Sequence, residues 1–324
     1  MFYNVENLFD TLDDPLTNDN AFLPNSALKW EQKRYVVKLQ RIARVLKEVE
    51  DPMPGIVGLA EVENRKVLED LVFTLGLTAN EVGIVHIDSP DERGIDVALL
   101  YRKDLFSLPD ESLVTPISVS FEENLSDKTR DILYVPLQNK SGDVLHIYVN
   151  HWPSRKEGKQ ISMKKRFAAS NTLKQHIDFK QTENPDSQIL VMGDLNCSPD
   201  SSPVYKVLDQ KANPENPLVN LGWDIHNANS GSTNFKGKWL MFDQVLVTPN
   251  LVGQTPTSGH VSASGHTPCV PTYTLMEFRT ISYPWMLYYN PKFNDHRPNK
   301  TYGGRRYHGG FSDHLPVAVE LNWD

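Results

Sequence analysis

The stretch Ile189-Leu-Val-Met-Gly-Asp-Leu-Asn196 is a short apolar run followed directly by an acid and an amide. Four apolar residues in a row are typical of a buried strand, and polar groups at a strand end are where proteins place functional side chains on a rigid support. A plain turn is the alternative, since Asp and Asn favour turns. The choice depends on whether the arrangement recurs along the chain.

It recurs at five other places. In each, polar residues end, follow or begin an apolar run that predicts a strand: Asn4-Val-Glu6, Glu61, Arg93-Gly-Ile-Asp96, Asn150-His151 and Ser312-Asp313-His314. Between them, apolar residues at three- and four-residue steps predict three amphipathic helices. The helices are expected over residues 33–49, 67–75 and 163–179, and the strands over 2–5, 55–60, 95–101, 132–137, 144–149, 189–192, 240–247 and 315–321.

No linker divides the chain, so we expect one α/β domain over residues 1–324. The stretch 248–311 is long, irregular and rich in Pro, Gly, Tyr and Trp, and a segment of this kind usually covers a site or takes part in function. A core strand that begins at the second residue suggests that an upstream leader has been removed. This leaves export open, and the sequence does not predict a location.

Composition limits the classes of protein. The 324 residues carry a net charge of −8 and no apolar run near the ~18 residues of a membrane span, which indicates a soluble protein without a spanning helix. Two cysteines, Cys197 and Cys269, exclude a disulfide scaffold and a Cys-rich zinc site. The acidic balance argues against tight non-specific duplex binding, but an enzyme can still approach phosphates through a metal ion.

The polar residues suit hydrolysis of a phosphate ester, in which a divalent metal neutralises charge on the phosphate oxygens. Mg²⁺ takes one or two carboxylates and several waters, so Glu61 with Asn4 would suffice. Asp194, held by Asn196, suits activation of the attacking water. Within the apolar run 239–247, Asp243 should be buried and need a partner, and His314 would supply one.

Seven motifs in this order resemble the endonuclease/exonuclease/phosphatase superfamily. They are Phe2-Tyr-Asn-Val-Glu-Asn7, Gly58-Leu-Ala-Glu-Val62, Asp96-Val-Ala-Leu-Leu-Tyr101, Val149-Asn-His-Trp-Pro153, Met192-Gly-Asp-Leu-Asn196, Phe242-Asp-Gln-Val245 and Ser312-Asp-His-Leu-Pro316. Gly-Asp-x-Asn and Ser-Asp-His are weak signals separately and strong in this order and spacing. The resemblance implies an α/β fold that is a four-layer α/β/β/α sandwich, with two mixed β-sheets packed face to face and helices outside.

The resemblance also implies roles and a Mg²⁺ or Mn²⁺ cofactor. The implied metal residues are Glu61, with Asn4 and Asp313 as auxiliaries, and the implied catalytic residues are His314, Asp243, Asp194, Asn196 and His151. A metal role for Glu6 stays open. Glu61 could instead cap the helix that starts near residue 64, where an acid suits the helix dipole.

Four further residues are expected to bind substrate: Asn150, Arg155, Arg93 and Asp96. For Arg93 and Asp96, a salt bridge at a hairpin is an equal alternative. Basic residues concentrate in 155–174 and 297–306, where they either contact phosphates or form a solvated surface.

The resulting hypothesis is a metal-dependent phosphodiesterase, a nuclease acting on DNA or RNA as a monomer. The first alternative is a phosphatase or phosphodiesterase acting on inositol phosphates or phospholipid head groups. No basic amphipathic helix for membrane binding is evident, which favours soluble substrates. The second alternative, a binding protein with a relict site, is disfavoured because every expected catalytic position holds a competent residue type.

Overall fold

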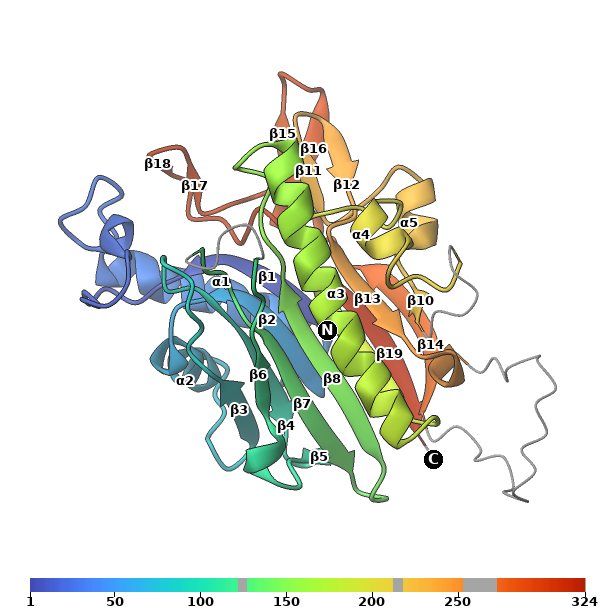
Figure 1. The fold of residues 1–324 in the computed structure, drawn as a ribbon. Helices are drawn as coiled ribbons and strands as arrows, with labels where there is room; N and C mark the ends of the chain where they lie inside the picture. The colour runs from blue at the N-terminus through green and yellow to red at the C-terminus, as the bar shows by residue number, and fades with distance from the viewer. Residues whose placement is uncertain (122–126, 212–217, 253–272, 324) are drawn as a thin grey trace, which may run out of the picture.

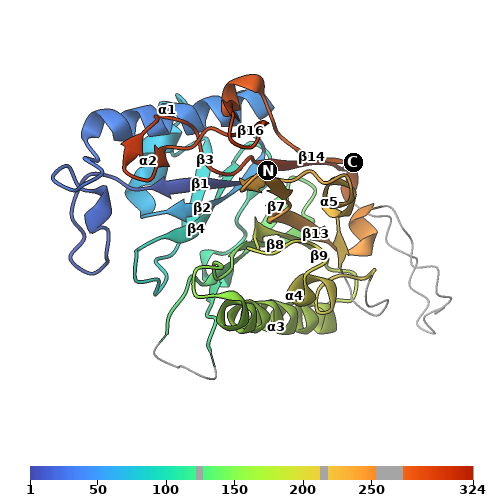
Figure 2. The same ribbon diagram turned by 90° about the horizontal axis from the view of Figure 1, so that it is seen from above.

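The computed structural model describes residues 1–121, 127–211, 218–252 and 273–323. Two β-sheets pack face to face, with helices on both outer faces (Figures 1 and 2). Helices α1 (Gln32–Val49) and α2 (Arg65–Thr74) cover one sheet, and α3 (Lys159–Glu183) and α4 (Ser202–Tyr205) cover the other. The predicted four-layer α/β/β/α sandwich is therefore confirmed.

Sheet 1 has six strands in the order β14-β19-β1-β2-β4-β3. Strands β1 and β2 run parallel and the other neighbours antiparallel, so the sheet is mixed. Its strands are β1 (Phe2–Leu8), β2 (Ile56–Val62), β3 (Val82–His86), β4 (Asp96–Arg102), β14 (Tyr273–Thr280) and β19 (Val317–Trp323).

Sheet 2 has the order β10-β13-β9-β8-β7-β5, and β6 pairs with β7 beside β5. Here β8 and β9 form the parallel pair. Its strands are β5 (Phe106–Ser107), β6 (Thr115–Ile117), β7 (Ile132–Asn139), β8 (Val144–His151), β9 (Gln188–Asp194), β10 (Val219–Asn220) and β13 (Asp243–Val247). Shorter elements are α5 (Trp223–Asn227) and 3₁₀ turns at Asn20–Phe22, Glu111–Leu113, Pro249–Val252 and Pro284–Met286.

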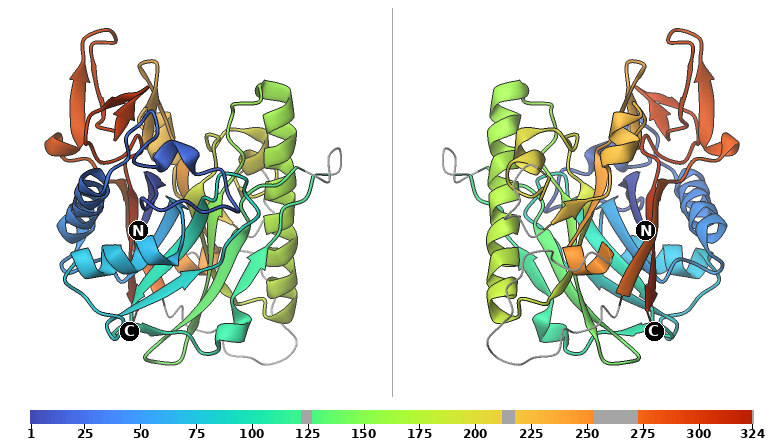
Figure 3. Two further views of the ribbon diagram at one scale, coloured as in Figure 1. Left: turned by 90° about the vertical axis from the view of Figure 1, so that its left-hand side faces the viewer. Right: turned by 90° about the vertical axis from the view of Figure 1, so that its right-hand side faces the viewer.

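Figure 3 shows the layers from two further sides. Buried apolar residues form three clusters, one between the sheets and one between each sheet and its helices. Helix α1 buries Leu39, Ile42 and Leu46 on one face, as its 3.6-residue periodicity requires. Between the sheets, a Cβ at Gly58 would lie 2.4 Å from the sulfur of Met192. Glycine at this position therefore lets β2 and β9 pack closely.

The segment 248–311 is more regular than its sequence suggests, where the structure describes it. It supplies the edge strand β14 and two hairpins, β15 (Leu287–Asn290) with β16 (Asp295–Pro298) and β17 (Tyr302–Gly303) with β18 (Arg306–Tyr307). A third hairpin, β11 (Thr233–Phe235) with β12 (Lys238–Leu240), precedes it. All three project from the end of the sandwich where β8 ends and α3 begins (Figure 1). Such short strands leave too little alternation to detect in the sequence.

Three arginines of α1 pack against aromatic rings of this segment. Arg34 lies 4.4 Å from the ring centre of Tyr307, Arg41 4.9 Å from that of Phe311, and Arg44 4.0 Å from that of Trp285. Cation–π contacts of this kind favour arginine over aromatic faces. They hold residues 285–311 against the outside of α1.

Two other features of the sequence concern membrane spans and the cysteines. No helix among the described residues is both long and apolar enough to cross a membrane. Cys197 is buried and free, and its thiol donates to the carbonyl of Leu195 at 3.1 Å. Burial raises the pKa of the Cys197 thiol to about 12, so this cysteine is a packing residue. Cys269 lies outside the described residues.

Candidate active site

Sheet 1 presents Asn4 and Glu61 through irregular backbone. Glu6, Asn7 and Glu61 have positive φ values of 53°, 55° and 63°, and the β1–β2 register shifts between Asn4 and Leu8. These bulges redirect the Glu61 carboxylate towards β1. Its Oε2 accepts from the Asn7 backbone N–H at 3.0 Å, and its Oε1 lies 3.5 Å from Asn4 Nδ2.

Sheet 2 presents its residues through regular pairing. Asp194 at the end of β9 is paired with Asp243 at the start of β13, and with His151 at the end of β8. The expected strand 240–247 is wrong at its start, because β12 ends at Leu240 and β13 begins only at Asp243. The backbone hydrogen bond from the Leu195 N–H to the Phe242 carbonyl, 2.9 Å long, joins the segment after β9 to the segment before β13.

Asp194 is the centre of the cluster. Its Oδ2 accepts from Asn4 Nδ2 at 3.1 Å, and its Oδ1 accepts from the Asn196 backbone N–H at 2.9 Å. The Nε2 atoms of His151 and His314 lie 3.7 and 3.8 Å from Asp194 Oδ2, and His151 Nε2 is 3.9 Å from Glu61 Oε1. The structure thus brings together five residues that the sequence places far apart.

His314 pairs with Asp243, as the sequence predicts: Nδ1 lies 2.6 Å from Asp243 Oδ2. Burial alone would lower the pKa of His314, but the negative charges of Asp243 and Asp194 raise it well above its usual value. The imidazole is therefore charged at neutral pH, and its Nε2–H is directed at the cluster. Ser312 fixes this corner, because its hydroxyl donates to the Asn4 carbonyl at 2.7 Å and accepts from the His314 N–H at 3.1 Å.

The pKa values of Asp194 and His151 are shifted in opposite directions. Burial and the nearby charge of Asp243 raise the pKa of Asp194 to about 6, against the lowering effect of His314. Burial, followed by the positive charges of Arg130 and Arg93, lowers the pKa of His151 well below its usual value. The two histidines are therefore set apart, because the pKa of His314 is raised and that of His151 is lowered.

Asn196 and Arg155 lie beside this cluster. Asn196 has φ 50°, and its Nδ2 donates to the Trp152 carbonyl at 2.9 Å. Arg155 is exposed; its Nε donates to the Asn196 carbonyl at 3.0 Å, and its guanidinium lies 4.4 Å from the ring centre of Phe242. Arg155 is thus an exposed cation held beside the site by Asn196 and Phe242.

Two residues expected to bind substrate are engaged within the protein instead. Asn150 is fully buried, and its Oδ1 accepts from the Trp152 indole N–H at 3.0 Å. Asp96 is 2% exposed and contacts His86 Nε2 at 3.1 Å and the Ser89 N–H at 2.9 Å. On β8 and β4 they alternate with Val149 and Val97, which pack between the sheets, so both lie on the face of their strand that points away from the other sheet. A substrate role for them stays a prediction.

The alternative roles considered for two other residues are also corrected. Arg93 does not pair with Asp96, since its Nε lies 3.7 Å from Asp91. Glu61 does not cap the next helix: Asn64 does so itself, accepting from the Val67 N–H at 3.0 Å.

Glu6 faces away from the Glu61 carboxylate. Its Oε2 accepts from the Thr301 N–H at 2.7 Å and lies 3.9 Å from Lys38 Nζ. Burial and the charge of Asp313 raise the pKa of Glu6 to about 7, while Lys38 lowers it. Lys38 is itself 1% exposed and donates to Thr301 Oγ1 and to the Phe311 carbonyl, both at 2.7 Å. Glu6 is therefore part of an anchor for the segment that leads into Ser312-Asp313-His314.

The residues fit a hard divalent cation. Glu61 and Asp194 offer carboxylate oxygens on either side of the Asn4 amide, and the one described thiol, Cys197, is engaged elsewhere. Asn4 Oδ1 accepts from the Glu6 N–H at 3.0 Å, so its NH₂ group, rather than its oxygen, is directed at the carboxylates. Asp194, Asp243 and His314 also lie within 4.8 Å of one another, but the Nδ1 of His314 is engaged by Asp243 and is not free to bind an ion.

Sequence reasoning missed Lys38 and Arg130. Arg130 is 7% exposed, and it donates to Asp91 at 2.8 Å and to the Trp152 carbonyl at 2.9 Å. For Lys38 a signal exists, since it stands at helical spacing between the core residues Tyr35 and Ile42. For Arg130 no local pattern distinguishes it from any exposed arginine.

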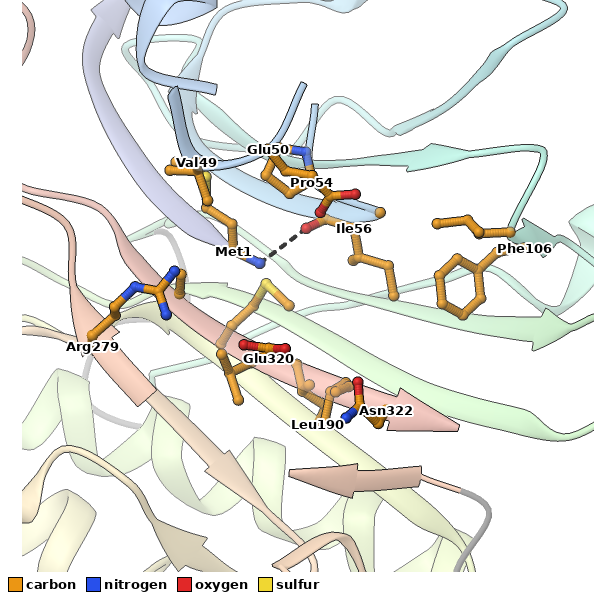
Figure 4. Close-up of a pocket in the computed structure, with 16 residues that line it drawn as sticks. Met1, Val49, Glu50, Pro54, Ile56, Phe106, Leu190, Arg279, Glu320 and Asn322 are labelled. Carbon is orange, nitrogen blue, oxygen red and sulfur yellow. Dashed lines mark hydrogen bonds between the residues drawn. The ribbon is translucent and has the colours of Figure 1, made fainter. Parts of the chain in front are cut away.

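A cavity of about 430 Å³ lies at the opposite end of the sandwich (Figure 4). Met1, Ile56, Leu190 and Phe106 line it, and the Met1 amino group donates to the Ile56 carbonyl at 2.9 Å. Its charged residues are Glu50, Arg279 and Glu320, with no histidine among the lining residues. This cavity therefore lacks the acid–histidine pairing of the cluster.

Solved structures share this fold. An endonuclease/exonuclease/phosphatase family protein from Bacteroides thetaiotaomicron is 15% identical, with a TM-score of 0.57 over 100% of this chain and 96% of its own. The mannosyl-6-phosphatase Bt3783 of Bacteroides thetaiotaomicron is 12% identical, with a TM-score of 0.58 over 99% and 98%. The human Nocturnin catalytic domain, with a bound sulfate anion, is 16% identical, with a TM-score of 0.55 over 88% and 87%. No curated protein sequence matches the chain.

Fold and site together define a hydrolase of phosphoester bonds. The profile of the Endonuclease/Exonuclease/phosphatase family matches residues 1–323. The chain belongs to this family.

Proposed function

We propose that the protein is a Mg²⁺- or Mn²⁺-dependent phosphodiesterase that cleaves nucleic acids with an activated water. The observation that carries the proposal is the position of Asp194 between a charged histidine, a neutral histidine and the Glu61 carboxylate. This arrangement combines a base with donors for developing negative charge, which is what hydrolysis of a phosphate ester requires.

Each residue has a distinct task. Asp194 takes the proton from the attacking water, and Asn196 and Asn4 hold its two oxygens in place. The imidazolium of His314, oriented by Asp243, donates from Nε2 to the charge that develops on the phosphate. His151 presents its Nε2 to the same space as a neutral donor.

Glu61 would hold the metal ion, with Asp313 as the auxiliary carboxylate. A bound divalent ion neutralises charge on the non-bridging phosphate oxygens. Asn4 would join as a ligand only by turning its oxygen away from the Glu6 N–H, so we assign it first to holding Glu61 and Asp194.

Exposed cations beside the cluster support a nucleic-acid substrate. Arg155 and Lys156 lie on the loop after β8, where the Nε of Arg155 donates to the Asn196 carbonyl. The second basic group, residues 297–306, lies on the projecting hairpins that pack on α1, and its contact with a substrate stays a prediction. The rest of the basic run after β8 does not support it. Arg166 is 2% exposed and donates to the Pro153 carbonyl at 3.1 Å, and Lys165 is ion-paired with Asp127 and Glu157.

The test is a substrate panel with Mg²⁺, Mn²⁺ or chelator: plasmid, single-stranded DNA, RNA, sphingomyelin and inositol phosphates. We expect metal-dependent nicking of plasmid and a KM that rises with salt, because each phosphate contact releases counterions. Glu61→Gln should raise the Mg²⁺ concentration for half-maximal rate by about tenfold or more. The matched control is Glu69→Gln, which removes an exposed carboxylate on α2. No cutting of nucleic acid under any metal condition would overturn the proposal.

One observation favours a second candidate, a phosphatase acting on a sugar, inositol or lipid head-group phosphate. The mannosyl-6-phosphatase shares the fold over 99% of this chain, and the buried Arg166 reduces the surface available to a long polyanion. Release of inorganic phosphate from head-group esters, with no cutting of nucleic acid, would select this candidate.

All groups of the cluster come from one chain, which supports a monomer as the active unit. Sedimentation of the active enzyme at assay concentration tests this point, and activity confined to a dimer would contradict it.

A further inference from the structure

A second pocket, of about 250 Å³, lies beside the catalytic cluster. Its walls come from the loop before β4, the segment before β7 and the loop after β8. The Trp152 carbonyl joins it to the cluster, since it accepts from Arg130 on the pocket side and from Asn196 on the catalytic side, each at 2.9 Å. Trp152 directly follows His151, so the two spaces share one wall.

Most acids that line the pocket form ion pairs with basic residues of the same lining. Asp91 is held by Arg130 at 2.8 Å and lies 3.7 Å from Arg93, and Lys165 pairs with Asp127 and with Glu157. Among the described residues, Glu92 is the one acid of the lining without an ion pair within 4 Å.

The cations of the pocket are more available than the acids. Lys128 and Lys156 are exposed, and neither has an ion pair within 4 Å in the described part of the chain. Two buried donors lack a partner there as well: the Nε of Arg130, a side chain 7% exposed, and the hydroxyl of Thr129, a residue 4% exposed. Buried donors usually have partners, so each such group in a stable wall indicates a missing acceptor.

We propose that this pocket binds a second phosphate group of the substrate, next to the phosphate that is hydrolysed. Lys128 and Lys156 supply the charge, Arg93 faces the same space, and Thr129 and Arg130 supply donors from the wall. The inference rests on the proposed phosphoester hydrolysis, and it narrows the substrate to molecules with at least two phosphates. The second phosphate could belong to a neighbouring nucleotide or to a polyphosphorylated head group.

The experiment compares substrates that differ by one phosphate. The first pair is the dinucleotide TpT and its phosphorylated forms pTpT and TpTp; the second is inositol 1-phosphate and inositol 1,4-bisphosphate. For the native enzyme we expect the extra phosphate to raise kcat/KM about tenfold in one of the two pairs, the one that resembles the natural substrate. The gain should come mainly from a lower KM. The pair that responds identifies the source of the phosphate.

In Lys128→Ala/Lys156→Ala this preference should fall to about twofold or less, and Lys128→Arg/Lys156→Arg should restore most of it. Lys47→Ala, an exposed lysine at the far end of α1, is the matched control and should keep the preference. An extra phosphate without benefit in the native enzyme, or a benefit that survives the double alanine change, would overturn the subsite.

Calorimetric binding of pTpT and of inositol 1,4-bisphosphate in chelator separates this inference from the proposed function. We expect the native protein to bind one of the two compounds at least fivefold more tightly than the double alanine variant does. Such binding without hydrolysis of any ester would overturn the proposed function and leave the subsite standing, whereas equal binding of both compounds by the two proteins would overturn the subsite.

Discussion

The two sheets bring side chains to the same point by different means. Sheet 2 does so by register: Asp243 and His151 are the ladder partners of Asp194, so ordinary strand pairing places them together. Sheet 1 does so by irregularity, because Glu6, Asn7 and Glu61 adopt positive φ and turn the Glu61 carboxylate to the cluster. Register is shared over a whole strand, whereas each bulge depends on a few residues. Asp194, Asp243 and His151 should therefore be robust in position, and Glu61 should be sensitive to single backbone changes.

The largest effect is expected for Asp243 on sheet 2 and its partner His314, which precedes β19 of sheet 1. His314→Ala or Asp243→Asn should each lower kcat by about 10²–10⁴, the usual scale of general acid–base help. The double variant should be little worse than either single one, because the residues act as a unit. Single-turnover rates measure this, with Asp178→Asn on the exposed face of α3 as the control. Losses that multiply fully would show that the two residues act independently.

The next largest effect is expected at Asn4, whose amide on sheet 1 donates to Asp194 on sheet 2. Asp194 must be ionised to act as a base, so kcat/KM should fall as the pH drops through about 6, where its pKa lies. The Asn4 amide donates to this carboxylate and lowers its pKa. Asn4→Ala should therefore move the acid limb of the pH–rate profile to higher pH. Asn64→Ala, which removes the N-cap of α2 just after β2, should leave the acid limb of the pH–rate profile in place. An acid limb unmoved by Asn4→Ala would remove Asp194 from the role of base.

A smaller effect distinguishes the bulges from the regular strands. At Asn7, with φ 55°, valine should destabilise the fold by about 1–2 kcal/mol relative to glycine, because a β-branched residue tolerates positive φ poorly. At Gln138 in β7, a regular strand position, the order should reverse, with glycine about 0.5–1 kcal/mol less stable than valine. Denaturant unfolding of the four variants measures both differences. The same order at both positions would mean that the bulge has no energetic cost.

The smallest effect lies outside the site, under α3. Burial, and then the charge of Lys180, lower the pKa of His146 to about 4. Its Nδ1 lies 2.8 Å from the Tyr134 hydroxyl. Between pH 6.5 and 4 the unfolded chain takes up the proton first, so stability should fall as the pH drops through this window, by about 1 kcal/mol after solvent screening.

Hydrogen exchange should then show α3 losing protection before α1. His146→Gln should flatten the dependence, and an unchanged slope in that variant would assign the acid sensitivity to other groups.

The contrast between regular strand pairing and irregular backbone also explains which parts of the site the sequence could predict. Asp194, Asn196 and His151 follow apolar runs directly, so their place at strand ends was predictable from local pattern. The direction of Asn150 and Asp96, away from the other sheet, was not predictable, because it depends on which face of each sheet packs on the other. The three long helices were predictable because hydrophobic periodicity marks α1, α2 and α3, whereas the four layers were implied by the resemblance of the motifs to the superfamily.

Contacts between distant segments were beyond local pattern. Arg130 takes its role from Asp91 and from the Trp152 carbonyl, which lie 39 and 22 residues away. Lys38 takes its role from residues more than 260 positions later. The short hairpins of 287–307 are defined by packing on the arginines of α1, and their strands are too short to show a period.

Lys38 also explains how a projecting segment can end at a fixed point. Its ammonium group donates to the Thr301 hydroxyl and to the Phe311 carbonyl, which flank the hairpin β17–β18. Both ends of this hairpin therefore meet at one buried amine, and Ser312 follows directly. The hairpin is a loop closed at its base, so a change at its tip need not move Ser312 or His314.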